Sequence, residues 1–152
     1  DKRGKVVHIE YTGLIDVHGI VESVPREHLM EWHAHHMEVK MLLHQRGSEE
    51  HGRLVRTTSI RDLTGLGMGH LWKPALDLFK EVIGSSQNYY PEMLDKVFIV
   101  NAPWVFTIAW KIIKGWLHHR TQAKINVLGS DFKDVLLEHV DAANLPSRLG
   151  GT

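Results

Sequence analysis

The sequence predicts an α/β fold in which a mostly parallel sheet is joined by crossover helices. Segments typical of strands and segments typical of helices alternate along the chain, as they do in this class. One strand-like segment, residues 96–101, contains a continuous apolar run, as strands do when both of their faces are covered. A chain of 152 residues with 43% hydrophobic content is long enough for one good core. We therefore expect a single domain over residues 1–152.

The N-terminal half is expected to contain two strands and one long helix. Residues 6–11 are short, β-branched and bounded by glycines, which predicts a strand. Pro25 opens a long amphipathic pattern that ends near Gly47 and predicts a helix, followed by a loop over residues 48–52. Residues 54–63 alternate enough to predict a second strand. The helix residues that we expect to be buried are Leu29, Met30, Met37, Met41 and Leu42.

The C-terminal half continues the alternation. The expected elements are a helix from about His70 to Ser85 or Ser86, a strand over residues 96–101, a helix over residues 103–117, a short buried strand over residues 124–128 and a helix from residues 129–130 to about Val140. Three alternating glycines form a loose turn before the first of these helices, and Pro74 is tolerable only in its first turn. Short apolar runs predict both strands.

The expected helix over residues 103–117 is apolar around most of its circumference. Its polar side chains, Thr107, Lys111 and Lys114, fall on one narrow stripe at helical spacing. The large side chains of the remaining surface include Trp104, Phe106, Ile108, Trp110, Ile112, Ile113 and Trp116. The helix is shorter than the ~20 residues that span a bilayer. Two interpretations remain open: a helix fully buried in the core, or one that faces a ligand or an interface.

The segment around this helix is basic. No Asp or Glu occurs between Lys96 and Ser130. The Lys and Arg side chains of this segment are Lys96, Lys111, Lys114, Arg120 and Lys124. Apolar burial and attraction to anionic headgroups add in membrane binding, so the segment favours contact with an anionic lipid surface. The alternative is a solvated stripe whose counter-charges lie elsewhere in the fold.

Composition and motifs disfavour several other functions. Lys and Arg number 18, as do Asp and Glu, so the zero net charge argues against a nucleic-acid-binding surface spread over the protein. The lack of cysteine excludes disulfides, and no secretory signal opens the chain, so we expect a cytoplasmic protein. The turn glycines do not complete a dinucleotide-binding pattern, because His70 stands where its last glycine would be. With no P-loop or esterase elbow either, we expect no enzyme and no cofactor.

Histidine is abundant, with 12 residues in the chain. Those on the expected first helix are His28, His33, His35, His36 and His44. Helical zinc sites usually use two ligands four residues apart, and no such histidine pair occurs here. His33 and His36 form the best available pair, but spacing places no third ligand beside them. We therefore expect a solvated polar face and no metal site.

A family pattern is carried by three long runs, SQNYYPEMLDKVFIVNAPWVF over residues 86–106, TQAKINVLGS over residues 121–130 and NLPSRLGGT over residues 144–152. Together they resemble the core of the CRAL-TRIO lipid-binding domain, the domain of the fungal phosphatidylinositol/phosphatidylcholine transfer protein. The run GLGMGHLWKP over residues 65–74 is most similar to the animal branch that contains supernatant protein factor, also called tocopherol-associated protein. Nearly the whole chain follows the family pattern in order.

The resemblance implies a pocket between a sheet floor and a mobile gate helix, in which one lipid or isoprenoid is sheltered from water. The gate of the family falls on residues 103–117. Members that bind phosphoinositides hold the headgroup with a Glu, a Thr and a Lys, which match Glu92, Thr121 and Lys124. Lys124 can neutralise a phosphate, and the other two can hydrogen-bond a headgroup. The alternative for Glu92 and Lys124 is a structural ion pair.

The family's hydroxyl pair for phosphatidylcholine matches Thr57 and Ser59. These residues lie two positions apart, so their side chains point the same way from the expected strand. The tyrosine of the family's first strand is replaced by His8. Ordinary packing of two small hydroxyl side chains is the alternative.

Two functions follow as hypotheses. The first is a domain that binds and transfers one lipid and contacts membranes transiently, with phosphatidylinositol the leading ligand class and isoprenoids second. The second is a protein-interaction module with a decayed lipid site, whose apolar face a partner chain covers. The family normally places a small helical region ahead of the first strand. We therefore expect a truncated or partial domain, whose pocket a protein partner could complete.

Overall fold

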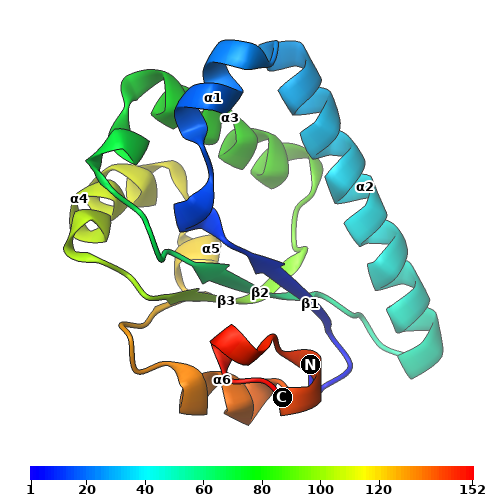
Figure 1. The fold of residues 1–152 in the computed structure, drawn as a ribbon. Coiled ribbons are helices and arrows are strands. Elements are labelled where there is room, and N and C mark those ends of the chain that lie inside the picture. The colour runs from blue at the N-terminus through cyan, green and yellow to red at the C-terminus, as the bar shows by residue number, and fades with distance from the viewer.

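The computed structural model describes residues 1–152 and confirms the predicted α/β class. Four strands form one fully parallel sheet in the order β1-β2-β3-β4. The strands are β1 (Val6–Glu10), β2 (Thr57–Asp62), β3 (Leu94–Val100) and β4 (Ile125–Val127). Parallel neighbours cannot be joined by a tight turn, so helical crossovers connect them (Figure 1).

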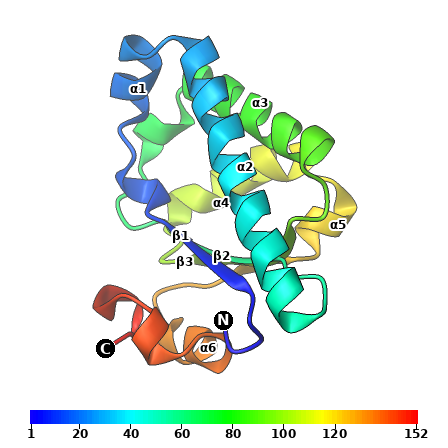
Figure 2. The same ribbon diagram turned by 90° about the vertical axis from the view of Figure 1, so that its right-hand side faces the viewer.

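The helices divide between the two faces of the sheet. They are α1 (Val17–Ser23), α2 (Arg26–His51), α3 (Lys73–Tyr89), α4 (Trp104–Ile113), α5 (His119–Gln122) and α6 (Lys133–His139). The strands follow one another across the sheet in chain order, and right-handed crossovers that progress in one direction lie on the same face. The helices α1 to α5 accordingly lie on one side, here named the α2–α4 face. The helix α6 and the C-terminal segment cover the other, the α6 face (Figures 1 and 2).

Several element boundaries differ from the predictions. The helix α2 continues through most of the expected loop over residues 48–52 and ends at His51. The next residue, Gly52, has a φ of 62°, the left-handed conformation common after helices. The helix α4 ends at Ile113, and a 3-10 turn over Lys114–Trp116 follows it. The short helices α1 and α5 were not predicted, since such segments carry too few residues for a helical period to be visible.

The strand predicted over residues 124–128 is present as β4, but the prediction that it is buried is wrong. The strand β4 lies at the edge of the sheet, and it pairs only with β3. Its Val127 is 46% exposed. An apolar run of this length cannot distinguish a covered central strand from an edge strand, because its length and composition are the same in both places.

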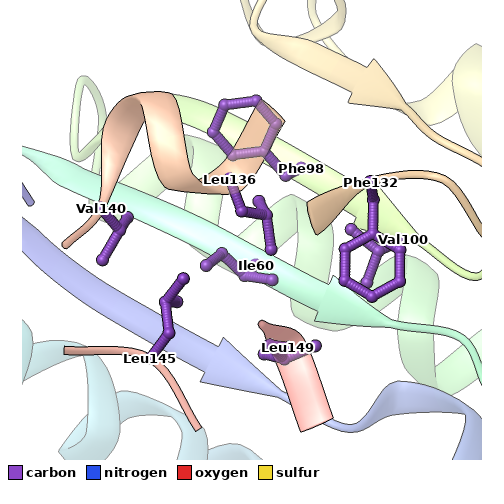
Figure 3. Close-up of a cluster of buried hydrophobic side chains, with 8 residues drawn as sticks. All are labelled: Ile60, Phe98, Val100, Phe132, Leu136, Val140, Leu145 and Leu149. Atoms are coloured by element: carbon purple, nitrogen blue, oxygen red, sulfur yellow. The ribbon is translucent and has the colours of Figure 1, made fainter. Parts of the chain in front are cut away.

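The core on the α6 face joins the sheet to the C-terminal third of the chain (Figure 3). Its buried residues are Ile60, Phe98, Val100, Phe132, Leu136, Val140, Leu145 and Leu149. Strand side chains from β2 and β3 meet side chains of α6 and of the segment that follows it. A Cβ added at Gly151 would overlap the carbonyl oxygen of Leu145, so the chain end packs closely against this segment.

A smaller core lies on the α2–α4 face. Its buried residues are Leu63, Val97, Ile99, Phe106 and Ala109. The strand β3 serves both cores, because alternate side chains of a strand point to opposite faces. Val97 and Ile99 point to one core, and Phe98 and Val100 to the other. This confirms the prediction that residues 96–101 contain a strand buried on both faces.

Asp62 connects the carboxyl ends of β2 and β3 to the C-terminal segment. Its side chain is 2% exposed and accepts hydrogen bonds from the Thr64 amide and hydroxyl at 2.9 and 2.7 Å and from Asn101 Nδ2 at 2.9 Å. Arg148 Nη2 lies 3.3 Å from its second carboxylate oxygen. The Arg148 guanidinium also lies 4.5 Å from the ring centroid of Tyr11. This network around the buried Asp62 links four separate segments of the chain.

Candidate functional site

The α2–α4 face of the sheet is polar in one half and apolar in the other. Register places His8 beside Ser59 and Ser59 beside Val97, and neighbours in register share a face. The polar half comes from β1 and β2 and consists of His8, Glu10, Thr57, Ser59 and Arg61. The apolar half comes mainly from β3. The helix α2 packs on the polar half, and α4 packs on the apolar half.

The helix α4 contacts the sheet with only part of its circumference. Val105, Phe106 and Ala109 are buried. Trp110 and Ile113 are partly buried against the same core, and the Trp110 ring stacks on that of Phe106 at 5.8 Å between centroids. The interpretation of this helix as a fully buried core helix is therefore wrong.

The outer side of α4 carries an apolar strip that we name the α4 ridge, consisting of Trp104, Ile108 and Ile112. These residues are 69%, 37% and 39% exposed and follow one another at a spacing of four, so they form one line along the helix. The predicted polar stripe lies beside this ridge. Its residues Thr107, Lys111 and Lys114 are exposed.

Trp116 belongs to the contact between the 3-10 turn after α4 and the helix α3. Its carbonyl oxygen accepts a hydrogen bond from Gln87 Nε2 at 3.0 Å. Lys80 Nζ lies 5.9 Å from the centroid of its ring. Both partners are on α3, so Trp116 anchors the end of the segment that the resemblance assigns to the gate.

The structure brings Glu92 and Lys124 together at the amino edge of the sheet. Glu92 lies just before β3 and Lys124 just before β4, and parallel strands begin at the same edge. Lys124 Nζ lies 3.8 Å from Glu92 Oε2 and donates a hydrogen bond to the Leu94 carbonyl at 2.6 Å. Thr121 lies on α5, and its carbonyl oxygen accepts a hydrogen bond from the Lys124 amide at 3.1 Å. The three residues matched to the headgroup site are thus neighbours.

Two arginines that the sequence analysis did not assign to the headgroup site join this pair. Arg56 Nη2 lies 3.4 Å from Glu92 Oε2, and Arg120 Nη1 lies 3.8 Å from Glu92 Oε1. We name Arg56, Glu92, Arg120 and Lys124 the edge cluster. The sequence contained one signal that could have placed Arg56 near Glu92. Arg56 directly precedes β2, and β2 pairs with β3, which begins just after Glu92. Glu92 has a φ of 61°, a left-handed conformation that non-glycine residues seldom adopt and that often occurs at functional sites.

The polar half of the floor contains buried atoms without partners. Thr57 and Ser59 are 1% and 2% exposed. The Thr57 hydroxyl is hydrogen-bonded to His44 Nε2 at 2.6 Å. The Ser59 hydroxyl and the neighbouring His8 Nδ1 are buried without a hydrogen-bond partner. Leaving such an atom unpaired costs about 1–3 kcal/mol, so this position suits a polar group from a bound molecule.

The prediction of a solvated histidine face on α2 is wrong for His33 and His44, whereas His28 and His35 are exposed. His33 and His44 are buried, whereas Met41 and Leu42, predicted to be buried, are 46% and 58% exposed. Because the sheet beneath α2 is polar, the histidines find partners there and on α3. His33 Nε2 lies 3.0 Å from the Ser86 hydroxyl, and the His36 ring lies 5.2 Å from that of His8. No group of three or more His, Asp or Glu side chains is arranged to hold a metal ion.

Burial holds several of these groups in their neutral form. Burial, with Lys40 adding repulsion, lowers the pKa of His8 to about 4. Burial is also the largest cause that lowers the pKa values of His33, His36 and His44. The pKa of Lys40 is lowered to about 8, first by burial and then by Arg61. The contact between α2 and the sheet therefore depends on uncharged imidazoles.

We expect this contact to make the domain less stable in mild acid. A histidine with a lowered folded pKa binds fewer protons than in the unfolded chain, so stability falls as the pH drops from 6.5 toward 4. The full shift of His8 would correspond to about 3 kcal/mol, and partial solvent exposure reduces this to about 1 kcal/mol. Urea unfolding at about pH 7 and about pH 5 measures the slope.

A histidine variant provides the control for this prediction. His8→Asn removes the titrating ring, so its stability should change less between the two pH values than that of the wild type. His28→Asn, at an exposed position of α2, should keep the wild-type slope. Equal slopes for the wild type and His8→Asn would contradict the assignment.

Two cavities lie away from α4. One of about 180 Å³ on the α6 face is lined only by polar side chains, among them Lys5, Asp95, Lys96 and His139. The other, of about 270 Å³, lies between α1, the start of α2 and α3. None of the helices combines the length and the apolar composition required to cross a bilayer.

Comparisons with known proteins identify the family of this chain. The profile of the CRAL/TRIO domain matches residues 1–151. Phosphatidylinositol/phosphatidylcholine transfer protein SFH11 of Arabidopsis thaliana is 37% identical over 99% of this chain and 41% of its own length. Sec14 cytosolic factor of Schizosaccharomyces pombe is 35% identical over 99% of this chain and 53% of its own length.

Among solved structures, the crystal structure of Sfh5 superposes on the whole chain with a TM-score of 0.70 at 23% identity, and the match covers 52% of that protein. At this identity the likeness supports the fold alone. The chain thus spans about half the length of the relatives that it matches. With its profile matched from residue 1 to residue 151, the chain belongs to the CRAL/TRIO domain family.

Proposed function

We propose that this domain binds one phospholipid, with phosphatidylinositol the leading ligand class, and transfers or presents it at membranes. The observation that carries the proposal is the edge cluster, in which three cations surround one carboxylate. A headgroup phosphate suits Lys124 and the arginines, while hydroxyl groups of an inositol ring suit Glu92. The printed names of the relatives, which describe phosphatidylinositol/phosphatidylcholine transfer, support the same ligand class. This function requires binding and release, and no catalytic step.

The acyl chains would occupy space that α4 now fills. Ligand pockets for drug-sized molecules measure about 300–1,000 Å³, and a phospholipid needs at least as much. Phe106 and Ala109 of α4 lie directly on Val97 and Ile99 of the sheet. We infer that α4 moves outward to admit the ligand, as the gate of the family does. The partly buried side chains of Trp110 and Ile113 would then line the chamber.

The α4 ridge supports contact with a membrane during this exchange. Trp104, Ile108 and Ile112 present apolar surface, and Lys111 beside them can attract anionic headgroups. A peripheral, transient association in the cytoplasm fits this arrangement. A second candidate function uses the same exposed surface: a partner protein could cover the ridge permanently in a domain that no longer exchanges lipid.

We expect Lys124→Ala to reduce loading with phosphatidylinositol by about tenfold or more, since a hydrogen bond to a charged group contributes about 1.5–3 kcal/mol. The domain is incubated with vesicles of phosphatidylcholine and phosphatidylinositol and then separated from them. Its bound lipid is extracted with organic solvent and identified by mass spectrometry. Lys133→Ala provides a matched control, because Lys133 is exposed on α6 at the other face of the sheet.

The two candidate functions give different results in this experiment. Lipid in the wild type and in Lys133→Ala, with a selective loss in Lys124→Ala, supports the proposal. A domain that leaves the vesicles without lipid contradicts it. A partner captured through the α4 ridge, together with no lipid exchange, would favour the interaction module.

A further inference from the structure

We propose that Arg56 and Arg120 extend the headgroup site so that it prefers an inositol lipid with a phosphomonoester on its ring over phosphatidylinositol itself. This inference rests on the proposed function and names the ligand class more narrowly. Neither arginine belongs to the Glu, Thr and Lys set that the family resemblance implied. Both are placed by the fold, because segments far apart in the chain meet at the amino edge of the sheet.

The single negative charge of a phosphodiester would not neutralise the positive charge of the edge cluster. Arg56, Arg120 and Lys124 supply three positive charges, and Glu92 supplies one negative charge at 3.4 to 3.8 Å. The phosphodiester of phosphatidylinositol would add one more negative charge. One cation would then remain without a counter-charge. A phosphomonoester, with a charge of about −1.5 to −2, would supply it.

The donors of the cluster are also incompletely used. Arg56 Nε is buried and has no hydrogen-bond partner. The approach of Arg56 to Glu92 is a single contact through Nη2, so Nε, which forms a two-donor edge with Nη2, is not engaged. A guanidinium binds phosphate with two parallel N–H donors, and its geometry favours phosphate oxygens over a single hydroxyl. A buried Nε without an acceptor is therefore a free donor that an oxyanion could engage.

Exposure increases outward through the three cations. The Lys124 and Arg56 side chains are 23% and 32% exposed, whereas the Arg120 side chain is 88% exposed on α5. The inner pair can hold groups close to the sheet. Arg120 can turn toward a group farther out without disturbing a packed neighbour. This gradation suits a headgroup that carries its second phosphate away from the glycerol.

The test measures lipid loaded into the 152-residue domain. Donor vesicles of phosphatidylcholine contain either phosphatidylinositol or an equal fraction of a phosphatidylinositol monophosphate, and the domain is separated from them before extraction. We expect about tenfold more loading with the monophosphate, a ratio typical of one added charge-assisted contact. Arg56→Gln should lower loading of the monophosphate more than loading of phosphatidylinositol, so that this ratio falls to about one.

Further variants separate the specific contact from general charge and from misfolding. Arg56→Lys keeps the charge but lacks the two-donor edge, so it should also lose most of the preference. Arg120→Gln changes an exposed residue and should reduce the preference without affecting the fold. Arg46→Gln, at an exposed position of α2 outside the cluster, should keep the wild-type ratio. A similar loss in Arg46→Gln would show attraction by overall charge and overturn the inference.

A headgroup analogue without acyl chains distinguishes the two sources of phosphate. The soluble analogue is glycerophosphoinositol monophosphate. If it binds to the wild type in solution, and Arg56→Gln weakens both this binding and the loading of the lipid, the arginine recognises the phosphate whether or not acyl chains are attached. Equal loading of the two lipids would overturn this inference while the proposed function stands. Loading of neither lipid would overturn both.

Discussion

Leu136→Ala lowers the free energy of unfolding by about 3 kcal/mol, the largest single effect that we expect. Leu136 has no exposed surface, and it packs against strand residues such as Ile60 and Phe98 in the core on the α6 face. Truncation removes apolar contacts and leaves a cavity that closely packed neighbours cannot fill. Urea unfolding followed by tryptophan fluorescence measures the loss.

Leu42→Ala is the matched control for this prediction. Leu42 also lies on a helix, but it is 58% exposed, so the same truncation should change the free energy of unfolding by no more than about 0.5 kcal/mol. Equal losses in the two variants would contradict the burial that the structure assigns to Leu136. Lipid loading of Leu136→Ala should remain at the wild-type level wherever the variant is folded, because the sheet separates this core from α4.

Asp62→Ala is expected to lower the free energy of unfolding by about 2–3 kcal/mol. Burial alone would raise the pKa of Asp62, but hydrogen bonds from Asn101 and Thr64, together with Arg148, hold it below its ordinary value. The variant leaves these donors without their shared acceptor at a position that is 2% exposed. Thermal unfolding should therefore show a lower midpoint.

Asp77→Ala tests whether this loss is specific to a buried carboxylate. Asp77 also pairs with a cation, Lys73 at 2.5 Å, but its side chain is 62% exposed on α3. Exposed pairs of this kind contribute about 0–1 kcal/mol, so the unfolding midpoint should hardly move. A comparable decrease for both aspartates would show that the buried network does not carry the effect.

The strand and helix order could be predicted because local sequence determines it. Residues 96–101 combine an apolar run with β-branched side chains, and β3 indeed lies between two cores. Pro103 precedes α4, whose polar stripe points outward as its spacing predicts. These features depend on the periodicity of residues within one segment, which can be read directly from the sequence.

The face that α2 buries could not be predicted, because the surface beneath it decides the matter. The sequence offered Met41 and Leu42 as core residues, whereas the polar strands below select His33 and His44. The full edge cluster could not be predicted either, because it depends on how the strands pair. The resemblance supplied Glu92 and Lys124, but Arg56 became visible only when pairing brought the start of β2 beside the start of β3.

The position of the sheet between two separate cores has a consequence for the cost of opening. Lifting α4 would disturb the small core around Phe106 and leave the eight buried residues on the α6 face in place. Opening of this kind is a local event, whose free energy is only a fraction of that of global unfolding. Under the proposed function, the domain would thus be stable as a whole and still exchange a bound lipid often. In hydrogen exchange, amides of α4 should lose protection well before those of β2 and β3.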